Sequence, residues 1–544
     1  MTGPTTEPPR RRLYALHRWV GLLFALLGML VFFSGAIATF HEEIDDWAGR
    51  GDRFPSPQQV ESFDFDEAMA AAANGVDGRY LHQVEIALRH GRPLLFFFHE
   101  HIKDGMGVEE LGVARTLDPE TLEVLGERTG DRAAAFTPRF SHSLSRFFID
   151  LHIFLLMPET LGLIATGISG FALLLLIATG FLVHRPNRTK MTRGPRTQHK
   201  RVFFSDFHTL VGSWSLPFTV IVALTGAFFS FAGVVLVPVV AMVAFDGDQE
   251  ALVRTVVGSV DVSDVDATAS LQPFVEDAIE RTDQARLTSI GLDHWGESEA
   301  SATVQLVSKS PFGDSLHTLV YDGHTGEFLL SKPRLGTQAS LGNTLVMLVA
   351  QLHFGTLFGI VTKLLWGVLG IATCVLAATG LLIFVARERS PDHVGMRLVR
   401  SMTVALAGGL PFATGLAFLS WVAAGAFEVD DPMTAMTWTF LLGLALCAGV
   451  GAVLKTPLAL SIAWAASGVA LAATVALAPS VTRVSLADAW SDPSLRHTLF
   501  VDGALLAGAF LCVGGAMLIA RSKGIGSYDP QRGNRLAVAP VERS

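Results

Sequence analysis

Long apolar stretches recur along the whole sequence and limit what this chain can fold into. Half of the residues are hydrophobic and only 17% are charged, whereas soluble domains contain about 25% charged residues. A helix needs about 20 mostly apolar residues to cross the hydrocarbon core of a bilayer. Eight stretches reach this length, approximately 19–40, 160–183, 209–241, 357–386, 402–425, 434–454, 457–479 and 499–520. The sequence therefore predicts a polytopic α-helical protein of the lipid bilayer with about eight spans.

Basic residues are concentrated on one side of such an eight-span arrangement. The basic segments are 10–12, 184–201, 386–400 and 520–535. Short loops rich in Lys and Arg stay in the cytoplasm, so we expect both termini there. The segment 42–150 has 21 Asp/Glu and 11 Lys/Arg, which fits a domain outside. The first stretch also resembles a signal peptide with a cleavage site at 36–38, but its apolar run exceeds the usual length of about 7–15 residues, so we expect it to be retained.

The chain contains an internal repeat in which histidines keep their spacing. His17 and His208 each precede a glycine by four residues. Each also lies 18 residues before the glycine of a Ser/Thr-Gly-Ala sequence, Gly35 in the first copy and Gly226 in the second. Internal repetition of this kind indicates a duplicated structural unit.

A second pair of histidines supports the same repeat. His152 and His353 lie 28 and 27 residues before the glycine of a Thr-Gly sequence in the second span of each copy. Residues 13–185 and 203–386 therefore read as one unit present twice, with the order span, outer domain, span. The four central spans then form a four-helix core.

Two copies with two spans each have the same orientation, so we expect a pseudo-twofold axis along the membrane normal. His17 then meets His208 near the cytoplasmic side, and His152 meets His353 near the periplasmic side. Opposed imidazoles about 4 Å apart are what a bis-histidine haem requires. We therefore predict two haem b groups, with the haem iron bound by His17, His208, His152 and His353. Small residues would let the porphyrins approach the backbone: Gly21, Gly212, Gly355 and Gly359.

The alternative for any single site is an interfacial polar residue, so the prediction depends on all four histidines being in register. Polar residues in spans are costly and tend to be functional. His41 and His184 also lie at span ends but have no counterpart in the other copy, and we treat them as reserve ligands of the iron. His152 precedes Pro158 and Glu159, so it is also compatible with a short interfacial helix above its span.

Two outer segments each read as a helix followed by strands, which predicts two periplasmic α+β domains. The predicted organisation is 1–41 for the N-terminus and span 1, 42–150 for the first periplasmic domain, 151–241 for spans 2 and 3 with a basic cytoplasmic loop, 242–345 for the second periplasmic domain, 346–390 for span 4, and 391–544 for a four-span extension with a cytoplasmic tail. The outer histidines are candidates to hold iron briefly, although most are expected to be solvated surface residues: His99, His101, His142, His294, His317 and His324.

These motifs resemble the PepSY-associated transmembrane family over about residues 10–390. The resemblance rests on LHRWVGLL, SGA, LH…TG and LHFG…TG, and its most specific part is DFHTLVGSW at 206–214. The outer segments resemble PepSY domains. Members include inner-membrane proteins of iron uptake, some of which are b-type di-haem reductases of ferric siderophores. The resemblance implies a bacterial inner-membrane location and the four histidines as haem ligands. It also makes Asp206 either a residue that orients His208 or a structural salt-bridge partner.

The resemblance and the histidine register favour a haem-containing transmembrane electron-transfer protein, an oxidoreductase that reduces ferric siderophores or other ferric chelates in the periplasm. The chain has no GxGxxG after a strand and no P-loop, so we expect an external donor, either a cytoplasmic flavin reductase or membrane quinol. No nucleic-acid partner is expected. The three cysteines lie inside apolar stretches without a CxxC, so we expect them to be buried and not ligands.

Two other classes of protein remain open from the sequence. In the first, PepSY domains sense a ligand or inhibit a protease and the spans only anchor them, so that the purified protein is colourless. The second, a secondary transporter, requires ionisable groups at mid-membrane. The only candidates for such groups are Lys363 and Lys455, and both can lie near an interface. Residues 400–520 extend beyond the family core, and partner contact, stability and quinone access remain open as their role.

Overall fold

A computed structural model describes residues 9–89, 91–104, 107–132, 136, 140–184, 192–197, 200–245, 252, 269–297, 299–308, 315–333, 338, 340–387 and 394–521. The chain forms two compact units. The first unit comprises Met1–Arg185, Ser215–Thr373 and Pro479–Val501. The second comprises Pro186–Trp214, Cys374–Ala478 and Asp502–Ser544.

Seven helical segments in the described residues are long and apolar enough to cross a membrane. They are formed by α6 (Glu159–His184), α9 (Leu216–Phe231) continued through the π-helical turn η3 (Ala232–Leu236) into α10 (Val237–Ala244), α14 (Ile360–Arg387), α16 (Gly409–Ala426), α17 (Pro432–Val453), α18 (Thr456–Leu477) and α21 (Leu499–Arg521). Helix α1 (Pro9–Ala38) is bent by 53° between its two arms and makes an eighth if they form one span. The protein is thus a polytopic helical membrane protein, as predicted.

Three of the four predicted ligands lie on shorter helices next to the spans. His208 is on α8 (Lys200–Trp214), which ends before α9, where Pro217 occupies the first turn. His152 is on α5 (Phe140–Phe154) and His353 is on α13 (Leu341–Phe354). The expected continuous span over 209–241 is therefore wrong at its start, because a proline in the first turn favours a new helix. His17 lies within α1.

The short helices α5 and α13 end in the same way in the two copies. After α5 the backbone is left-handed at Leu155 and Leu156, with φ of 55° and 58°. After α13 it is left-handed at Gly355 and Gly359, with φ of 68° and 57°. A Cβ at Gly355 would also lie 2.9 Å from the Trp366 side chain. The left-handed helix end and the Trp366 contact both favour glycine at 355, and the porphyrin contact stays a prediction.

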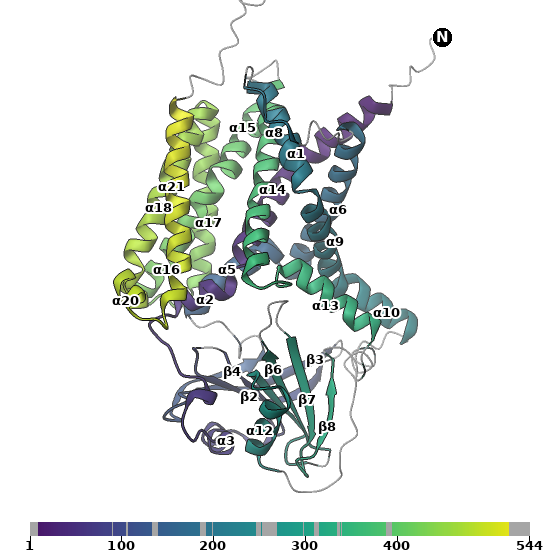
Figure 1. Cartoon of the computed structure of the whole chain (residues 1–544), viewed down its shortest axis with the longest axis vertical. Helices are drawn as coiled ribbons and strands as arrows, with labels where there is room; N and C mark the ends of the chain where they lie inside the picture. Colours follow the sequence, from purple (N-terminus) through teal and green to yellow (C-terminus); the bar gives the residue numbers. More distant parts are fainter. Residues whose placement is uncertain are drawn as a thin grey trace, which may run out of the picture. The chain divides into compact units, whose positions relative to one another are not determined.

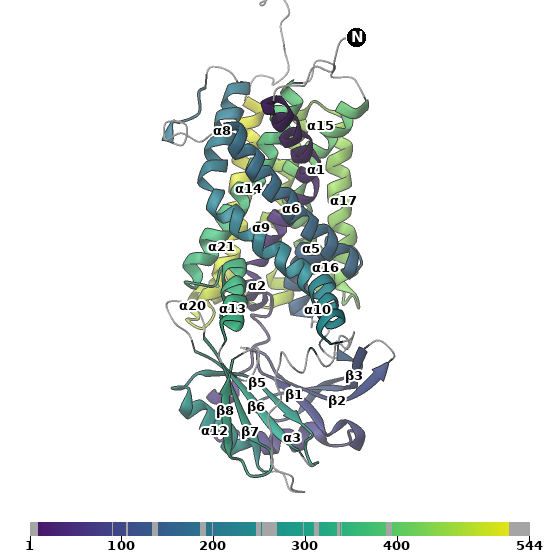
Figure 2. The same cartoon turned by 90° about the vertical axis from the view of Figure 1, so that its right-hand side faces the viewer.

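The strands of both outer segments form one antiparallel sheet with the order β4-β3-β2-β1-β5-β6-β7-β8. Their bounds are β1 Gln83–Ala87, β2 Leu94–Asp104, β3 Gly107–Leu117, β4 Val124–Asp131, β5 Arg286–Asp293, β6 Ser301–Ser308, β7 Ser315–Asp322 and β8 Phe328–Lys332. Figure 2 shows β1 and β5 side by side in the middle of the sheet, where Ile86 pairs with Ile290. The two copies therefore share a single sheet, although the sequence predicted a separate small domain for each.

One helix from each copy packs on the same face of this sheet: α3 (Phe65–Ala73) and α12 (Leu271–Arg281) (Figure 1). The two helices cap each other. The Asp66 carboxylate accepts from the backbone N–H of Leu271 at 2.8 Å, and the Gln272 side chain accepts from the N–H of Phe65 at 3.1 Å. Free N–H groups in the first turn of a helix need such acceptors, so each copy completes the fold of the other.

The helices of the second unit pack through small residues. The contacts involve α15 (Val394–Ala407), α16, α17 and α18, and the Ser461 hydroxyl of α18 donates to the Ala516 carbonyl of α21 at 2.9 Å. A Cβ at Gly415 would lie 2.7 Å from Ala470 Cβ, and one at Gly451 would lie 2.8 Å from Val404 Cβ. Close approach at small residues is typical of membrane helices. The three cysteines are buried, as expected: Cys374, Cys447 and Cys512.

A buried arginine joins two distant parts of the first unit. Arg50 follows α2 (His41–Ala48) and is only 2% exposed. Its guanidinium donates to the Thr482 hydroxyl at 3.3 Å and to the Val484 carbonyl at 2.9 Å, next to α19 (Pro479–Thr482) and before α20 (Leu486–Ser491). The segment between α18 and α21 is thereby attached to α2. The remaining short helical turns are η1 (Pro57–Gln59), η2 (Gly78–Tyr80) and η4 (Arg496–Thr498).

Replacing this arginine should destabilise the first unit. Arg50→Met removes the guanidinium that donates to the buried Thr482 hydroxyl and Val484 carbonyl, and we expect a loss of about 2–4 kcal/mol in the free energy of unfolding. SDS titration in mixed micelles measures this change. Arg53→Met is the matched control, because Arg53 bonds to Ser494 at the surface, and it should change the value by less than about 1 kcal/mol. Equal effects of the two substitutions would contradict this account of Arg50.

Candidate functional site

The first unit brings His152 and His353 together. Their ring centroids lie 6.2 Å apart with 33° between the ring planes. His152 is the third-last residue of α5 and His353 the second-last of α13, so both rings stand just before the sharp turn into a span. These two helices come from equivalent positions of the two copies, as the repeat predicted.

Each of these rings is fixed through its Nδ1 atom by a neighbouring helix. His152 Nδ1 donates to the Val31 carbonyl of α1 at 2.9 Å. His353 Nδ1 lies 2.9 Å from the Thr225 hydroxyl of α9. Thr225 itself donates to the Ile221 carbonyl at 2.8 Å, so its oxygen accepts from Nδ1. In both rings the proton of the neutral form is therefore on Nδ1, and Nε2 carries the lone pair.

His17 and His208 have the same local arrangement, each in its own unit. His17 Nδ1 lies 3.0 Å from the Thr179 hydroxyl of α6. His208 Nδ1 lies 3.1 Å from the Thr379 hydroxyl of α14 and 3.0 Å from the Leu376 carbonyl. Both hydroxyls donate to carbonyls of their own helices. His17 belongs to the first unit and His208 to the second, so their approach stays a prediction.

A glycine makes room for each of the four imidazoles. In every case it directly follows the serine or threonine of a Ser/Thr-Gly sequence. The distances from a Cβ built on the glycine to the Cε1 atom of the ring are 2.7 Å for Gly35 and His152, 3.2 Å for Gly180 and His17, 3.3 Å for Gly226 and His353, and 3.5 Å for Gly380 and His208. The first of these is sterically forbidden and the next two are tighter than ordinary contacts. Glycine thus lets the ring lie against the adjacent helix.

The histidines and glycines pair across the two spans of each copy. The sequence register related His17 to Gly35 of the same helix, whereas the structure puts His17 against Gly180 and His152 against Gly35. Thr179, Thr225 and Thr379 were not predicted as hydrogen-bond partners. The Thr-Gly dipeptide that recurs in α6, α9 and α14 was the signal for them.

Other glycines near the histidines have packing roles. A Cβ at Gly21 would lie 3.6 Å from Leu176, and one at Gly212 would lie 3.3 Å from Leu376. These two equivalent positions therefore allow helix packing within their own units. Among the described residues, nothing lies within 4 Å of a Cβ at Gly359, where the positive φ favours glycine.

The separation of the outer pair fits a shared metal. Two metal–nitrogen bonds of about 2.0–2.1 Å place two axial nitrogens about 4 Å apart, and their ring centres roughly 2 Å farther. The observed 6.2 Å between centroids matches this distance. Phe229 and Phe354 lie 5.4 Å and 5.5 Å from the His353 ring and present apolar surface beside it. The donor set and its surroundings are therefore suited to a haem.

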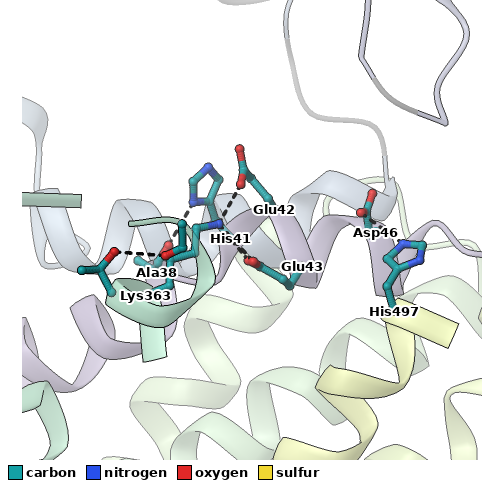
Figure 3. A network of polar contacts seen from close by, with 9 residues as sticks. Ala38, His41, Glu42, Glu43, Asp46, Lys363 and His497 are labelled. Carbon is teal, nitrogen blue, oxygen red and sulfur yellow. Dashed lines mark hydrogen bonds and ion pairs between the residues drawn. The ribbon is translucent and has the colours of Figure 1, made fainter. Parts of the chain in front are cut away.

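The reserve ligand His41 lies in different surroundings from the four predicted ligands. Its Nδ1 donates to the Ala38 carbonyl at 3.1 Å, at the end of α1 (Figure 3). The neighbouring Glu42 and Glu43 accept from the Lys363 ammonium at 2.7 Å and 3.0 Å. His41 thus lies in the polar layer formed by α2 and the start of α14. The other reserve ligand, His184, ends α6, and its side chain lies outside the described residues.

Lys363 and Lys455, the two lysines considered for a secondary transporter, lie at an ion-pair network and at the start of a helix. Lys363 is 9% exposed and paired with the two glutamates. Lys455 is exposed and is the N-cap residue of α18.

Asp206 forms a two-pronged salt bridge with Arg196, at 2.7 Å and 2.9 Å. The hydrogen bonds from Arg196 lower the pKa of Asp206, and the salt-bridge alternative for this residue is the one observed.

A second polar cluster connects α5, which carries His152, to α2 and the sheet. The Ser145 hydroxyl of α5 donates to the Asp45 carboxylate of α2. Arg92, next to β2, donates to the Asp45 backbone carbonyl at 2.5 Å. The His142 ring lies 4.0 Å from the same carboxylate. Burial raises the pKa of Asp45 to about 6, against the opposing effects of Ser145 and Arg92.

The remaining outer histidines have varied surroundings. His294 and Glu297 lie 3.3 Å apart, His317 bonds to the Ser308 hydroxyl at 2.9 Å, and His324 accepts from the Ala300 N–H at 3.3 Å. His99 and His101 instead lie together beside Glu110.

The fold and the histidine sites define a class: a multi-span membrane protein in which a duplicated histidine-bearing hairpin carries a shared eight-stranded sheet. The family described as PepSY-associated TM region matches residues 14–387, so the chain belongs to this family, as the sequence motifs indicated. An uncharacterized protein of Pseudomonas aeruginosa is 26% identical over 368 residues, which cover 63% of this chain and 89% of the relative. The family match ends before α15–α18 and α21.

Lys363, in the polar layer formed by α2 and the start of α14, should contribute to the free energy of unfolding. Lys363→Met leaves Glu43, whose side chain is 23% exposed, without its partner, and we expect a loss of about 1–3 kcal/mol in the free energy of unfolding. SDS titration measures it. Lys455→Met removes an exposed lysine and should change the value by no more than about 0.5 kcal/mol. A Lys363→Met protein as stable as the wild type would show that the ion pairs are not stabilising.

The raised pKa of Asp45 predicts a pH-dependent effect on stability. The folded state holds this proton more tightly than the unfolded state, so the contribution of Asp45 is favourable at low pH and is lost as pH rises through about 6. Asp45→Asn keeps an acceptor for Ser145 and removes the charge. Its stability relative to the wild type should therefore increase between pH about 4 and 6 and level off above 7. A thermal-unfolding difference that is independent of pH would contradict the raised pKa.

Proposed function

We propose that this protein is a haem-containing transmembrane electron-transfer protein. It reduces ferric chelates, ferric siderophores among them, in the periplasm with electrons from a cytoplasmic flavin reductase or from quinol. The observation that carries the proposal is the pair His152 and His353, whose rings lie 6.2 Å apart with both Nδ1 atoms hydrogen-bonded. Membership of the PepSY-associated family agrees with it.

In this proposal haem b is bound at two levels, by His152 with His353 and by His17 with His208. A haem with two histidine ligands carries single electrons and has no open axial position for dioxygen. Two haems are needed because one would leave much of the roughly 30 Å hydrocarbon core without a carrier. The four Ser/Thr-Gly sequences support this arrangement, since each makes the same ring contact.

The chain itself orients the ligands and excludes water. The Val31 carbonyl and the Thr225 hydroxyl accept the Nδ1 proton and so direct the Nε2 lone pair away from their helices. A hydrogen bond from the second imidazole nitrogen fixes the tautomer and increases the basicity of the ligand. Phe229 and Phe354 cover His353 with apolar surface, and a dry surrounding tunes the potential of a bound haem.

The proposed topology is that of the bacterial inner membrane, with eight spans when α1 is counted as one. The basic segments at 10–12, 184–201, 386–400 and 520–535 support a cytoplasmic location of both termini. The shared sheet then lies in the periplasm as two PepSY-like parts. One electron converts ferric to ferrous iron in the chelate, and hard-oxygen chelators bind the ferrous ion less tightly, so reduction releases the metal.

The absorption spectrum of the purified protein tests the function. Wild type should show a Soret band, with split α and β bands after dithionite, and about two haems per chain. His353→Ala should lower the haem content to about one, because the outer pair loses a ligand. The pyridine haemochromogen assay, scaled to protein concentration, measures the ratio.

Two matched variants distinguish the loss of a haem ligand from a change in the surroundings of that ligand. Thr225→Val keeps the ligand and removes its acceptor, so it should keep both haems under saturating haem and release the outer one about 10-fold more easily. His317→Asn, in the sheet, should retain the wild-type haem content. A colourless wild-type protein from haem-supplied cells would reject the function in favour of a PepSY binding or regulatory protein. Full haem content in His353→Ala would reject the ligand assignment.

A further inference from the structure

A compact group of metal-binding side chains lies on the shared sheet, away from the histidines of the helices. His99 and His101 are on β2, and Glu110 is on β3 directly opposite His101 in the strand register. Successive side chains of a strand point to opposite faces, so both histidines lie on the face of Phe97. The neighbouring Phe96 and Phe98 face the core under α3 and α12. The group is therefore outside the hydrophobic core.

The three side chains converge. One ligand atom from each of His99, His101 and Glu110 lies within 4.8 Å of the others. The two imidazole centroids are 5.3 Å apart with 62° between the planes, and His101 Nε2 is 3.8 Å from Glu110 Oε1. Two imidazoles and a carboxylate on adjacent strands thus border a common space.

His99 is held in place by the sheet. It is 7% exposed, and its ring stacks on Phe97 with centroids 4.6 Å apart and 7° between the planes. Its Nδ1 donates to the Phe97 carbonyl at 3.4 Å, so the lone pair of the neutral ring is on Nε2. On β3 the residue opposite His99 is Gly112, where a Cβ would lie 2.8 Å from His99 Cβ. Gly112 provides the room that His99 occupies.

Glu110 is oriented by an arginine. Arg132 donates to Glu110 Oε2 at 2.9 Å and also bonds to Glu85 at 2.5 Å. The other carboxylate oxygen, Oε1, faces His101. A carboxylate ligand that is itself hydrogen-bonded on its second oxygen is common in metal sites. With one arginine between two glutamates, the group keeps a net negative charge that favours a cation.

The group borders a hollow of about 440 Å³. Its lining includes Glu85, Asp293 and Gln305 besides the three side chains above. This hollow is open to solvent on one side and gives room for an ion with its remaining water ligands. A metal bound here would be exchangeable.

We propose that His99, His101 and Glu110 form a binding site for a divalent transition-metal ion on the shared sheet. Imidazole nitrogens select borderline ions such as Zn²⁺ and Fe²⁺, whereas Mg²⁺ and Ca²⁺ prefer oxygen ligands. Bonds of about 2.0–2.2 Å to nitrogen and oxygen need ligand atoms roughly 3.3 Å apart, so the side chains close by about 1 Å around the ion. Three protein ligands leave further positions for water. This site is independent of the haem proposal.

Calorimetric titration of the full-length protein in detergent with Zn²⁺, and with Fe²⁺ under anaerobic conditions, tests the site. The protein carries an affinity tag without histidine. Wild type should bind one ion saturably, and His101→Asn and Glu110→Gln should each weaken binding by about 10-fold or more. Both substituted residues are at least partly exposed, so folding should be retained, and the thermal midpoint of each variant verifies this.

His317→Asn is the matched control, because His317 lies on β7 of the same sheet and bonds to Ser308. It should leave the affinity within about twofold of wild type. The haem spectrum of every sample is recorded, so that loss of haem and loss of metal binding are distinguished. Absence of a saturable site tighter than about 1 mM in wild type, or equal affinities in the two cluster variants and the control, would overturn the proposal.

Discussion

The structure depends on how an imidazole is accommodated between apolar helices. A buried N–H without an acceptor costs free energy comparable to a lost hydrogen bond. Here each Nδ1 proton has an acceptor on the other span of the same copy, a hydroxyl in three cases and the Val31 carbonyl in the fourth. The adjacent glycine removes the side chain that would keep the ring away. Each span thus positions the histidine that belongs to its neighbour, and the two spans of a copy depend on each other.

The same mutual dependence is present outside the helices. Asp66 of the first copy caps α12 of the second, and Gln272 caps α3 in return. The single core beneath the sheet contains side chains of both copies. Asp45 then connects this sheet to α5 through Arg92 and Ser145. Since α5 carries His152, the position of that ring depends on packing well beyond the apolar helices.

Much of this arrangement was predictable, because the signals were local. Stretches of about 20 apolar residues identify spans, and nearly equal spacings of 28 and 27 residues identified His152 and His353 as equivalent before any geometry was known. The helix break before Pro217 could also have been predicted from the proline, but the continuous apolar stretch led to the prediction of one unbroken span. The partners of the histidines were not predictable in the same way, since the register relates residues by their spacing along one span and the observed contacts cross to another helix. The pairing of β1 with β5 could not be predicted from the sequence either, because it depends on where the helices hold the two segments.

The pairing of β1 with β5 has a consequence for how such a chain can have arisen. These are the first strands of the two copies, and they meet antiparallel in the middle of the sheet. A protein with only one copy would expose that strand as an open edge, which invites association with another chain. The equivalent surface on an identical molecule would satisfy it with twofold symmetry. A protein with a single copy would therefore cover this edge best as a homodimer, and two copies in one polypeptide keep the same interface within a single chain.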